Sequence, residues 1–278
     1  MPDEPKSVLI TGASTGIGRA AALYLAERGY RVAATSRSLD RLNGLRREAE
    51  RFGDIHCVEL DVDSDRSVTE ATESVIEAYG RVDVLVNNAG YGLWGPVQSF
   101  SLEELRSQLE TNFFGAFRMI KAVLPSMTAA GSGTIINVSS VEGRLVTPFS
   151  GGYAASKFAL EGLSEALRYE LWPQGIRVAV VEPGLFATGF HDSQVEAADA
   201  GSPDLPYGPS IARYREQRGK YDRFAKDPVR VAKVIHRIIR SRRPRFRYPV
   251  GMEATIGIPA SQLMPERLYQ AILGRAIG

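Results

Sequence analysis

The chain has 278 residues, 44% of them hydrophobic and 24% charged, and its 34 basic and 32 acidic side chains leave a net charge of +2. This composition is typical of a globular domain with a substantial core, and so small a net charge argues against a nucleic-acid partner. The one cysteine, Cys57, excludes an intrachain disulfide and is compatible with a reducing compartment. Neither a signal peptide nor the roughly 20 apolar residues of a membrane span stands out, so we expect a cytoplasmic protein with no membrane span.

Short apolar runs alternate with helical patterns over the first two-thirds of the chain. We expect strands at 7–10, 31–36, 55–60, 82–90, 133–140 and 176–184. The runs are nearly continuous, which is typical of strands that helices cover on both faces. Strand–helix alternation at this pitch predicts βαβ units, and right-handed crossovers then give an α/β fold with a doubly wound, mainly parallel sheet of the Rossmann type.

The chain changes character after Gly189. Residues 191–210 are polar, with several Gly and Pro, and predict a loop. The segments beyond it predict two helices and a last strand, at 211–224, 228–241 and 245–251.

We expect one domain over 1–278, in which residues 189–226 form a mobile lid over the substrate and residues 227–278 a helical C-terminal tail. His191, near the start of the lid, is either a substrate contact or an ordinary loop residue. The lid also carries aromatic side chains that either close the pocket or pack on the body of the domain: Tyr207, Tyr214, Tyr221 and Phe224.

The first expected strand is followed by the sequence TGASTGIG, residues 11–18, and then by a helix-forming segment. Its glycines are Gly12, Gly16 and Gly18, a spacing that differs from the G-x-G-x-x-G fingerprint. A glycine-rich turn here lets backbone amides approach a pyrophosphate, whose charge the helix N-terminus stabilises. A plain tight turn is the alternative, but the position between strand and helix favours a dinucleotide site.

The end of the second expected strand indicates which dinucleotide binds. An acidic residue there would accept a hydrogen bond from the ribose of NAD, whereas an arginine would pair with the 2′-phosphate of NADP. The chain has Ser36 and then Arg37. We therefore predict NADP rather than NAD, with Arg19 as a further phosphate contact. The alternative is that Arg37 is solvated surface.

These motifs, with several others, occur in an order that resembles the short-chain dehydrogenase/reductase family. The resemblance spans roughly residues 7–188 and its glycine spacing is similar to that of the single-domain branch. It rests on TGASTGIG at 11–18, DVD at 61–63, NNAG at 87–90, Asn112 in ETNFFG, NVSS at 137–140, YAASK at 153–157 and PGLFAT at 183–188. The RYPVG sequence at 247–251 is thinly similar to steroid- and retinoid-type members.

The resemblance implies a NAD(P)-dependent oxidoreductase whose catalytic residues are Asn112, Ser140, Tyr153 and Lys157. Ser140 fits the family spacing better than Ser139 does. In the family pattern Asn112 holds a water behind the lysine. With Arg37 from the argument above, the expected cofactor contacts are Gly12, Ser14, Thr15, Gly16, Ile17, Gly18, Arg37, Asp61, Val62, Asn88, Ala89, Gly90, Tyr153, Lys157, Pro183, Gly184 and Thr188.

The spacing of Tyr153 and Lys157 suits proton transfer to a carbonyl oxygen. Residues i and i+4 lie on one helix face, and a nearby cation lowers the pKa of a tyrosine from its ordinary value of about 10. Ser140 ends a strand at the edge where open α/β sheets bind ligands, so its hydroxyl can polarise the substrate oxygen. The alternative is a Tyr–Lys pair on a solvated helix face. A stripe of leucines along the same helix favours a packed one: Leu160, Leu163, Leu167 and Leu171.

We expect substrate contacts from Ser140 and Tyr153 and from largely apolar side chains that follow the strands. These are Trp94, Phe149, Leu185 and Phe186, with Tyr91, Leu145 and Val146 as further candidates. An apolar pocket indicates a hydrophobic ketone, aldehyde or alcohol as the substrate, although part of this set would serve equally as core. Histidine and cysteine do not cluster, so no metal site is predicted, and His56 and His236 are expected to be structural.

The basic stretch from Arg237 to Arg247 either binds an anionic partner or forms a solvated helix end or subunit contact. The small net charge favours the second interpretation. The family resemblance implies a homodimer or homotetramer formed through the helices that carry Asn112 and Tyr153. The functional alternatives are the same chemistry with NAD and a non-catalytic dinucleotide-binding sensor, against which the complete catalytic set argues.

Overall fold

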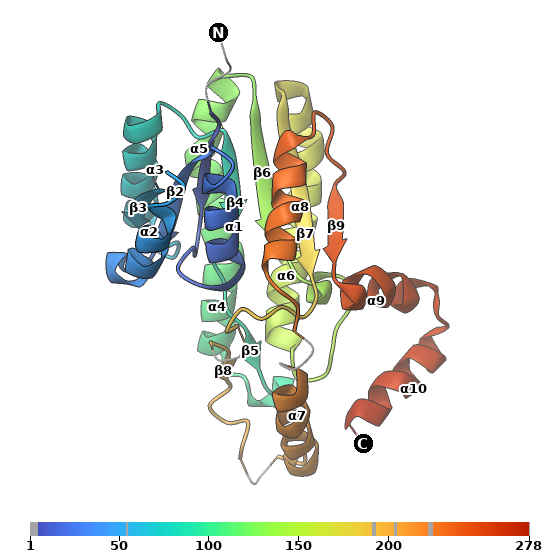
Figure 1. The fold of residues 1–278 in the computed structure, drawn as a ribbon. Coiled ribbons are helices and arrows are strands. Elements are labelled where there is room, and N and C mark those ends of the chain that lie inside the picture. The colour runs from blue at the N-terminus through green and yellow to red at the C-terminus, as the bar shows by residue number, and fades with distance from the viewer. Residues whose placement is uncertain (1–4, 54, 191–192, 203–204, 222–224, 278) are drawn as a thin grey trace.

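The computed structural model describes residues 5–277 apart from 54, 191–192, 203–204 and 222–224. Its centre is a parallel sheet with the strands β1 (Ser7–Ile10), β2 (Arg31–Ser36), β3 (Ile55–Glu59), β4 (Val84–Asn87), β6 (Gly133–Val138), β7 (Ile176–Pro183) and β9 (Arg247–Val250). These strands form a seven-stranded sheet in the order β3-β2-β1-β4-β6-β7-β9 (Figure 1). The doubly wound parallel sheet predicted from the sequence is therefore confirmed.

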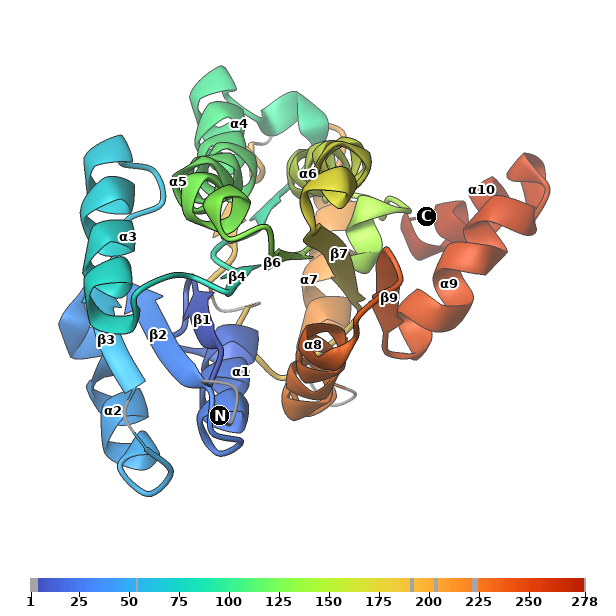
Figure 2. The ribbon, with the colours of Figure 1, turned by 90° about the horizontal axis from the view of Figure 1, so that it is seen from above.

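Helices cover both faces of the sheet (Figure 2). One face packs against α1 (Gly16–Ala26), α2 (Asn43–Ala49) and α8 (Val229–Arg240), and the other against α3 (Asp65–Tyr79), α5 (Ala116–Ala129) and α6 (Gly151–Leu171). Alternate side chains of a strand enter different cores: Val8 and Ile10 of β1 face the first set of helices, and Leu9 the second. Burial on both faces explains why the strands have nearly continuous apolar sequences.

The order of the strands reverses between β1 and β4, because β2 and β3 continue on one side and β6, β7 and β9 on the other. Open α/β sheets bind ligands at the carboxyl ends of their strands, at such a switch point. The parallel register brings these ends together: Ile10 is opposite Val86, and Val138 is opposite Val181. This edge points down in Figure 1, where β5 (Leu93–Trp94), β8 (Val195–Glu196) and α7 (Gly208–Tyr221) lie.

The segment after Gly189 has more structure than the sequence predicts. The expected loop at 191–210 contains β8, which pairs in parallel with β5. The Val195 amide donates to the Gly92 carbonyl (2.8 Å), and the Ala197 amide to the Trp94 carbonyl (2.9 Å). A two-residue strand has no periodicity to read, so only its tertiary partner defines it.

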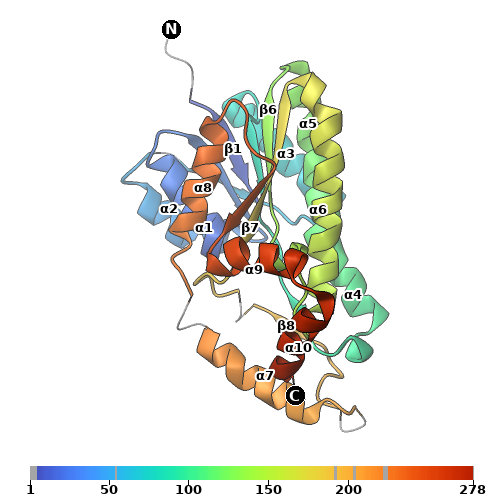
Figure 3. The same ribbon diagram turned by 90° about the vertical axis from the view of Figure 1, so that its right-hand side faces the viewer.

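The tail adds two helices after β9, α9 (Met252–Leu263) and α10 (Glu266–Ile277). They extend from the β9 edge of the sheet, and α10 contacts α7 (Figure 3). Within the described part of the chain, no helix combines the length and apolar character needed to cross a membrane.

Candidate active site

A cavity of about 1290 Å³ follows the carboxyl edge of the sheet, from the glycine turn after β1 to α7. Its lining includes every predicted cofactor residue except Gly18, and every predicted catalytic residue except Asn112. The two exceptions have a common reason, because both lie directly behind the cavity wall: Gly18 packs against Gly12 and Asn88, and Asn112 bonds to Tyr91.

The glycine turn is shaped by close contacts that leave no room for side chains. Gly12 and Gly16 have φ values of +66° and +57°, in the left-handed region that favours glycine. A Cβ atom on Gly18 would overlap the carbonyl oxygen of Gly12 and lie 2.5 Å from Nδ2 of Asn88. That Nδ2 donates to the Gly12 carbonyl (3.1 Å), so Asn88 at the end of β4 holds the turn in its bend. The turn can therefore admit a phosphate close to its backbone.

The end of β2 presents cations without an acid. Ser36 is buried, while the exposed Arg37 and Arg41 both line the cavity. Arg19 does not line it, because its guanidinium is paired with Glu48. The second cation at the end of β2 is thus Arg41, four residues after Arg37, in the short helix η1 (Leu39–Leu42). The sequence did not identify Arg41 because it belongs to no recognisable motif.

Residues after β3 and β7 form the walls of the middle of the cavity. The carboxylate of Asp61 accepts a hydrogen bond from the Asp63 amide (3.1 Å), and Val62 packs against Gly115. Thr188 lies against Gly16, so the turn after β7 meets the glycine turn across the cavity. Pro183 and Gly184 complete this wall.

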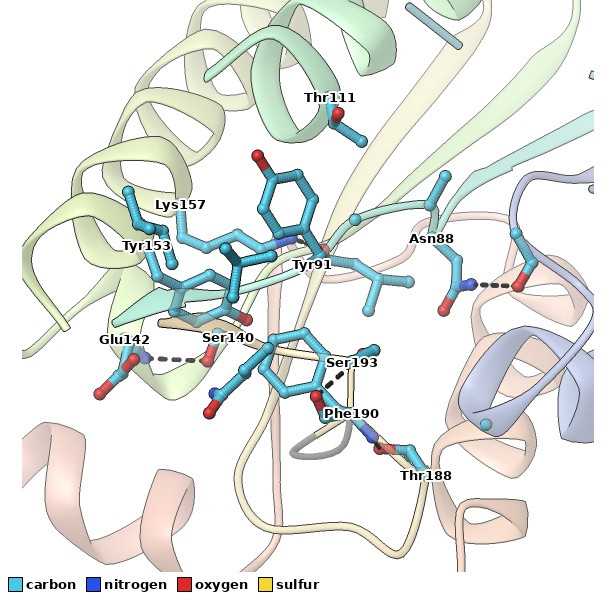
Figure 4. A pocket seen from close by; sticks show the side chains of 18 of the residues that line it. Asn88, Tyr91, Thr111, Ser140, Glu142, Tyr153, Lys157, Thr188, Phe190 and Ser193 are labelled. Carbon is cyan, nitrogen blue, oxygen red and sulfur yellow. Dashed lines mark hydrogen bonds between the residues drawn. The ribbon is translucent and has the colours of Figure 1, made fainter. Parts of the chain in front are cut away.

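Tyr153 and Lys157 lie on one face of α6, both buried, and converge with Ser140 on the cavity (Figure 4). The Ser140 hydroxyl hydrogen-bonds the Tyr153 phenol. Lys157 Nζ lies 5.7 Å from the centre of the Tyr153 ring and donates to the Val138 carbonyl (3.0 Å). Ser139 differs from Ser140 in that its hydroxyl is buried beside Gly143. Ser140 is therefore the serine placed to touch a substrate oxygen beside the phenol.

Asn112 lies in a π-helical turn, η3 (Glu110–Gly115), between α4 (Leu102–Leu109) and α5. Its Nδ2 donates to the Tyr91 carbonyl (2.9 Å) and to the Ser156 hydroxyl (3.0 Å), and its Oδ1 accepts from the Tyr91 amide (3.0 Å). Such π-turns are often found at functional sites. Here the turn fixes the loop after β4 against α6, directly behind Lys157.

Burial shifts the pKa values of both titratable groups toward their neutral forms. It raises the pKa of Tyr153, which the hydrogen bond to Ser140 partly opposes. It lowers the pKa of Lys157 from 10.5 to about 8, which the nearby Glu161 carboxylate partly opposes. At neutral pH the phenol thus keeps a proton to donate, beside a lysine that is still mostly cationic.

The substrate end of the cavity is lined by all four predicted apolar residues, Trp94, Phe149, Leu185 and Phe186. Tyr91 and Leu145 also line it, whereas Val146 is 44% exposed and does not. Several lining residues were not identified from the sequence: Glu142, Phe190, Gln194 and Glu253. Phe190 lies with its ring 5.4 Å from that of Tyr153. A lone aromatic in a polar loop gives no sequence signal for such a contact.

Tyr214 of α7 and Tyr207, just before that helix, pack on this end of the cavity. The Tyr214 ring lies 5.6 Å from Trp94 and 5.4 Å from Phe149, and Tyr207 lies 6.5 Å from Phe149. Phe149 has φ +66°, an uncommon value for a bulky residue and the kind of strain found at functional sites. His191, Phe224 and the side chain of Tyr221 lie outside the described residues.

His56, His236 and the basic stretch lie away from the cavity. His56 Nε2 lies 3.2 Å from the Ser74 hydroxyl, and His236 packs edge-on against two tyrosines of the α1–β2 region. Arg247 contacts the carboxylates of Glu161 and Glu165 at 2.9 Å each, so it ties β9 to α6. The other five arginines of the stretch are exposed: Arg237, Arg240, Arg242, Arg243 and Arg245.

A Rossmann-type sheet with a glycine turn at one end of its cleft and a Ser–Tyr–Lys group at the other defines a dinucleotide-dependent oxidoreductase. Residues 6–199 match the family model for short chain dehydrogenase. The chain belongs to the short-chain dehydrogenase/reductase family and is a NAD(P)-dependent enzyme of that family.

Individual relatives span nearly the whole chain. It is 38% identical over 271 residues to 3-ketodihydrosphingosine reductase of Bacteroides thetaiotaomicron, covering 97% of both chains. It is 40% identical over 257 residues to retinol dehydrogenase 8 of Bos taurus, covering 89% of this chain and 82% of the relative. It is also 37% identical over 257 residues to human 17-beta-hydroxysteroid dehydrogenase type 1, covering 87% and 76%. The predicted likeness to steroid- and retinoid-type members is confirmed.

A solved structure shows the same fold. An alcohol dehydrogenase from the archaeon Thermococcus sibiricus, complexed with 5-hydroxy-NADP, has a TM-score of 0.73 at 29% identity, covering 89% of this chain and 96% of that chain.

Proposed function

We propose that the protein is an NADP-dependent oxidoreductase that interconverts a hydrophobic ketone or aldehyde and the corresponding alcohol. The observation that carries the proposal is the convergence of Ser140, Tyr153 and Lys157 on a cavity that begins at a glycine turn. The nicotinamide supplies or accepts the hydride, and the protein supplies placement and the proton.

The residues of this chain fit a dinucleotide with a 2′-phosphate. The glycine turn leaves its backbone accessible, and Arg37 and Arg41 supply positive charge where Ser36 replaces an acid. The complex of the Thermococcus sibiricus relative with 5-hydroxy-NADP supports the same assignment.

Each catalytic side chain has one task in carbonyl reduction. Tyr153 donates its proton to the carbonyl oxygen, and the Ser140 hydroxyl hydrogen-bonds that oxygen and orients it. Lys157 places its positive charge beside the phenol and stabilises the phenolate that forms. Asn112 keeps the wall behind Lys157 fixed through its bonds to Tyr91 and Ser156. Oxidation of the alcohol uses the same groups in reverse.

Apolar and aromatic side chains at the far end of the cavity support a hydrophobic substrate. The names of the relatives, which refer to retinol, 3-ketodihydrosphingosine and a hydroxysteroid, support the same class. The packing of Tyr214 on this end supports residues 189–226 as a lid.

We also propose a homodimer or homotetramer. The outer faces of η3, α5 and α6 expose Phe114, Phe117 and Phe158 by 38–44%, and apolar surface of this kind marks subunit contacts. A cytoplasmic location stays a prediction.

The cofactor assignment is tested by the variants Arg37→Ala and Arg41→Ala, with Arg46→Ala as an exposed control outside the cavity. Losing a charge-assisted phosphate contact costs about 1.5–3 kcal/mol, so the Kd for NADPH should rise roughly 10- to 100-fold in the Arg37 variant. The Kd for NADH should change little. Equal weakening of both cofactors would favour the NAD-dependent alternative, and tight NADPH binding without turnover of any carbonyl would favour a sensor.

A further inference from the structure

Glu142 lies beside the catalytic serine, in a short turn, η4 (Val141–Gly143). Its backbone amide donates to the Ser140 hydroxyl (3.1 Å), and the residue lines the cavity next to Tyr153 (Figure 4). The carboxylate is close enough to the phenol for its charge to raise the pKa of Tyr153. An acid so near the reacting groups has no part in the proton transfer described above.

The carboxyl of Glu142 accepts a hydrogen bond from the Thr147 hydroxyl, while the Ser150 hydroxyl donates to the Thr147 carbonyl (2.7 Å). None of the ion pairs between described residues includes it. Two neighbouring acids do have cations: Arg144 contacts Glu182 at 3.0 Å, and Lys226 contacts Glu253 at 3.2 Å.

Burial raises the pKa of Glu142, and no positive charge of a described residue is paired with its ionised form. A cation bound in the cavity would supply that charge and restore the carboxylate.

Two further buried polar atoms of the same cavity lining lack a hydrogen-bond partner among the described residues, the Ser139 hydroxyl beside Gly143 and Oε1 of Gln194. The remaining walls of the substrate end are mainly apolar and aromatic, as described for Trp94, Phe149 and Phe186. The lining therefore fits a molecule with an apolar body and a compact polar donor.

We propose that Glu142 binds an ammonium group that the substrate carries within a few bonds of its reacting carbonyl. The substrate class is then an amino ketone, or the corresponding amino alcohol, attached to an apolar chain. This proposal rests on the proposed oxidoreductase function and narrows its substrate.

Two matched ketones test the proposal: 1-amino-2-nonanone and 3-decanone, which differ by an ammonium in place of a methyl group. NADPH oxidation gives kcat/KM for each. The wild type should prefer the amino ketone, and Glu142→Gln, whose amide oxygen still accepts the Thr147 hydroxyl, should lower that preference about tenfold, because a hydrogen bond to a charged group is worth about 1.5–3 kcal/mol.

Glu142→Asp keeps the charge and should keep the preference for the amino ketone. A purely structural role for Glu142 would lower both activities in parallel. A parallel loss in Glu142→Gln, or a wild type with no preference for the amino ketone, would overturn the proposal.

A binding measurement separates this proposal from the function on which it rests. Calorimetry should show that octylamine binds the wild type about tenfold more tightly than Glu142→Gln, while 1-octanol binds both alike. Equal octylamine affinity would overturn the ammonium site. The absence of turnover with every carbonyl, alongside selective octylamine binding, would instead overturn the oxidoreductase function and leave the site standing.

Discussion

Tyr153 and Lys157, the proposed catalytic pair, illustrate what burial does to titratable groups. Both side chains lie almost wholly out of solvent, at 8% and 5% exposure. Burial raises the pKa of the phenol and lowers the pKa of the ammonium to about 8. Burying the Lys157 ammonium destabilises the folded state. The same burial places its positive charge beside the Tyr153 phenol, which becomes an anion in the proposed proton transfer.

Replacing Lys157 by Met should therefore stabilise the protein while it abolishes reduction. A lysine with its pKa lowered from 10.5 to about 8 destabilises the folded state wherever it is charged, so removing it should raise the free energy of unfolding by about 1–3 kcal/mol at pH 7. The gain is full below pH 8 and shrinks as the pH rises from about 8 to 10.5, because the folded wild type then carries a neutral lysine. Thermal or denaturant unfolding across this pH range measures it.

The control is Lys121→Met, at an exposed position of α5, which should change the stability little at any pH. A Lys157→Met protein that is less stable than the wild type at pH 7 would contradict the account, since it would show that the bond to the Val138 carbonyl outweighs the cost of burial.

At the scale of elements, the cofactor end depends on how α1 leaves β1. The Thr11 hydroxyl accepts hydrogen bonds from the amides of Asn88 and Ala89 (2.9 Å each), so the ends of β1 and β4 are joined before the helix begins. Gly18 lies in the first turn of α1, against this junction. Because α1 approaches the ends of β1 and β4 this closely, its N-terminus points into the cavity.

Gly18→Ala should lose cofactor binding and stability together. Its methyl group would overlap the Gly12 carbonyl, and relief of that overlap displaces the turn, at a cost of about 1–3 kcal/mol for an overpacked site. The matched control is Gly162→Ala on the exposed side of α6, where nothing lies within 4 Å of the added carbon. That change should stabilise by up to about 1 kcal/mol, from helix propensity alone. NADPH titration and thermal unfolding of both variants measure the contrast, and equal behaviour would contradict the described packing.

At the scale of the whole molecule, residues of the C-terminal tail and of the segment around α7 complete the cavity at the carboxyl edge of the sheet. β9 extends the sheet, Arg247 ties it to α6, and α7 closes the far end of the cavity with Tyr214 (Figures 1 and 3). The outer faces of α5 and α6 are left exposed.

If the chain forms the proposed oligomer, a charged side chain on the exposed face of α5 and α6 should weaken the subunit contact. Phe158→Arg should shift the mass measured by light scattering toward the monomer, because burying an unpaired guanidinium in a subunit contact is unfavourable. Phe52→Arg, at a comparably exposed position after α2, should leave the mass unchanged. A monomeric wild type would refute the proposal.

The parts of the structure that the sequence predicts are those with a local pattern. The strands of the seven-stranded sheet are recognisable because burial on both faces makes them apolar, and the glycine turn because it joins a strand to a helix. Arg41, Glu142 and Phe190 were missed because only the tertiary fold brings them to the cavity. Ordinary polar or aromatic residues in loops give no signal of their own.

The central claim is that Tyr153 donates the proton in carbonyl reduction, and one comparison tests it most directly. NADPH oxidation is followed for the wild type and Tyr153→Phe with aliphatic, aromatic, steroid and retinoid ketones and aldehydes, and NADPH binding is measured for both. Phe keeps the ring packed against Phe190 and removes only the hydroxyl. The account predicts a loss of kcat of at least about a hundredfold, as for removal of a general acid, with NADPH still bound. Turnover that survives in Tyr153→Phe would contradict it.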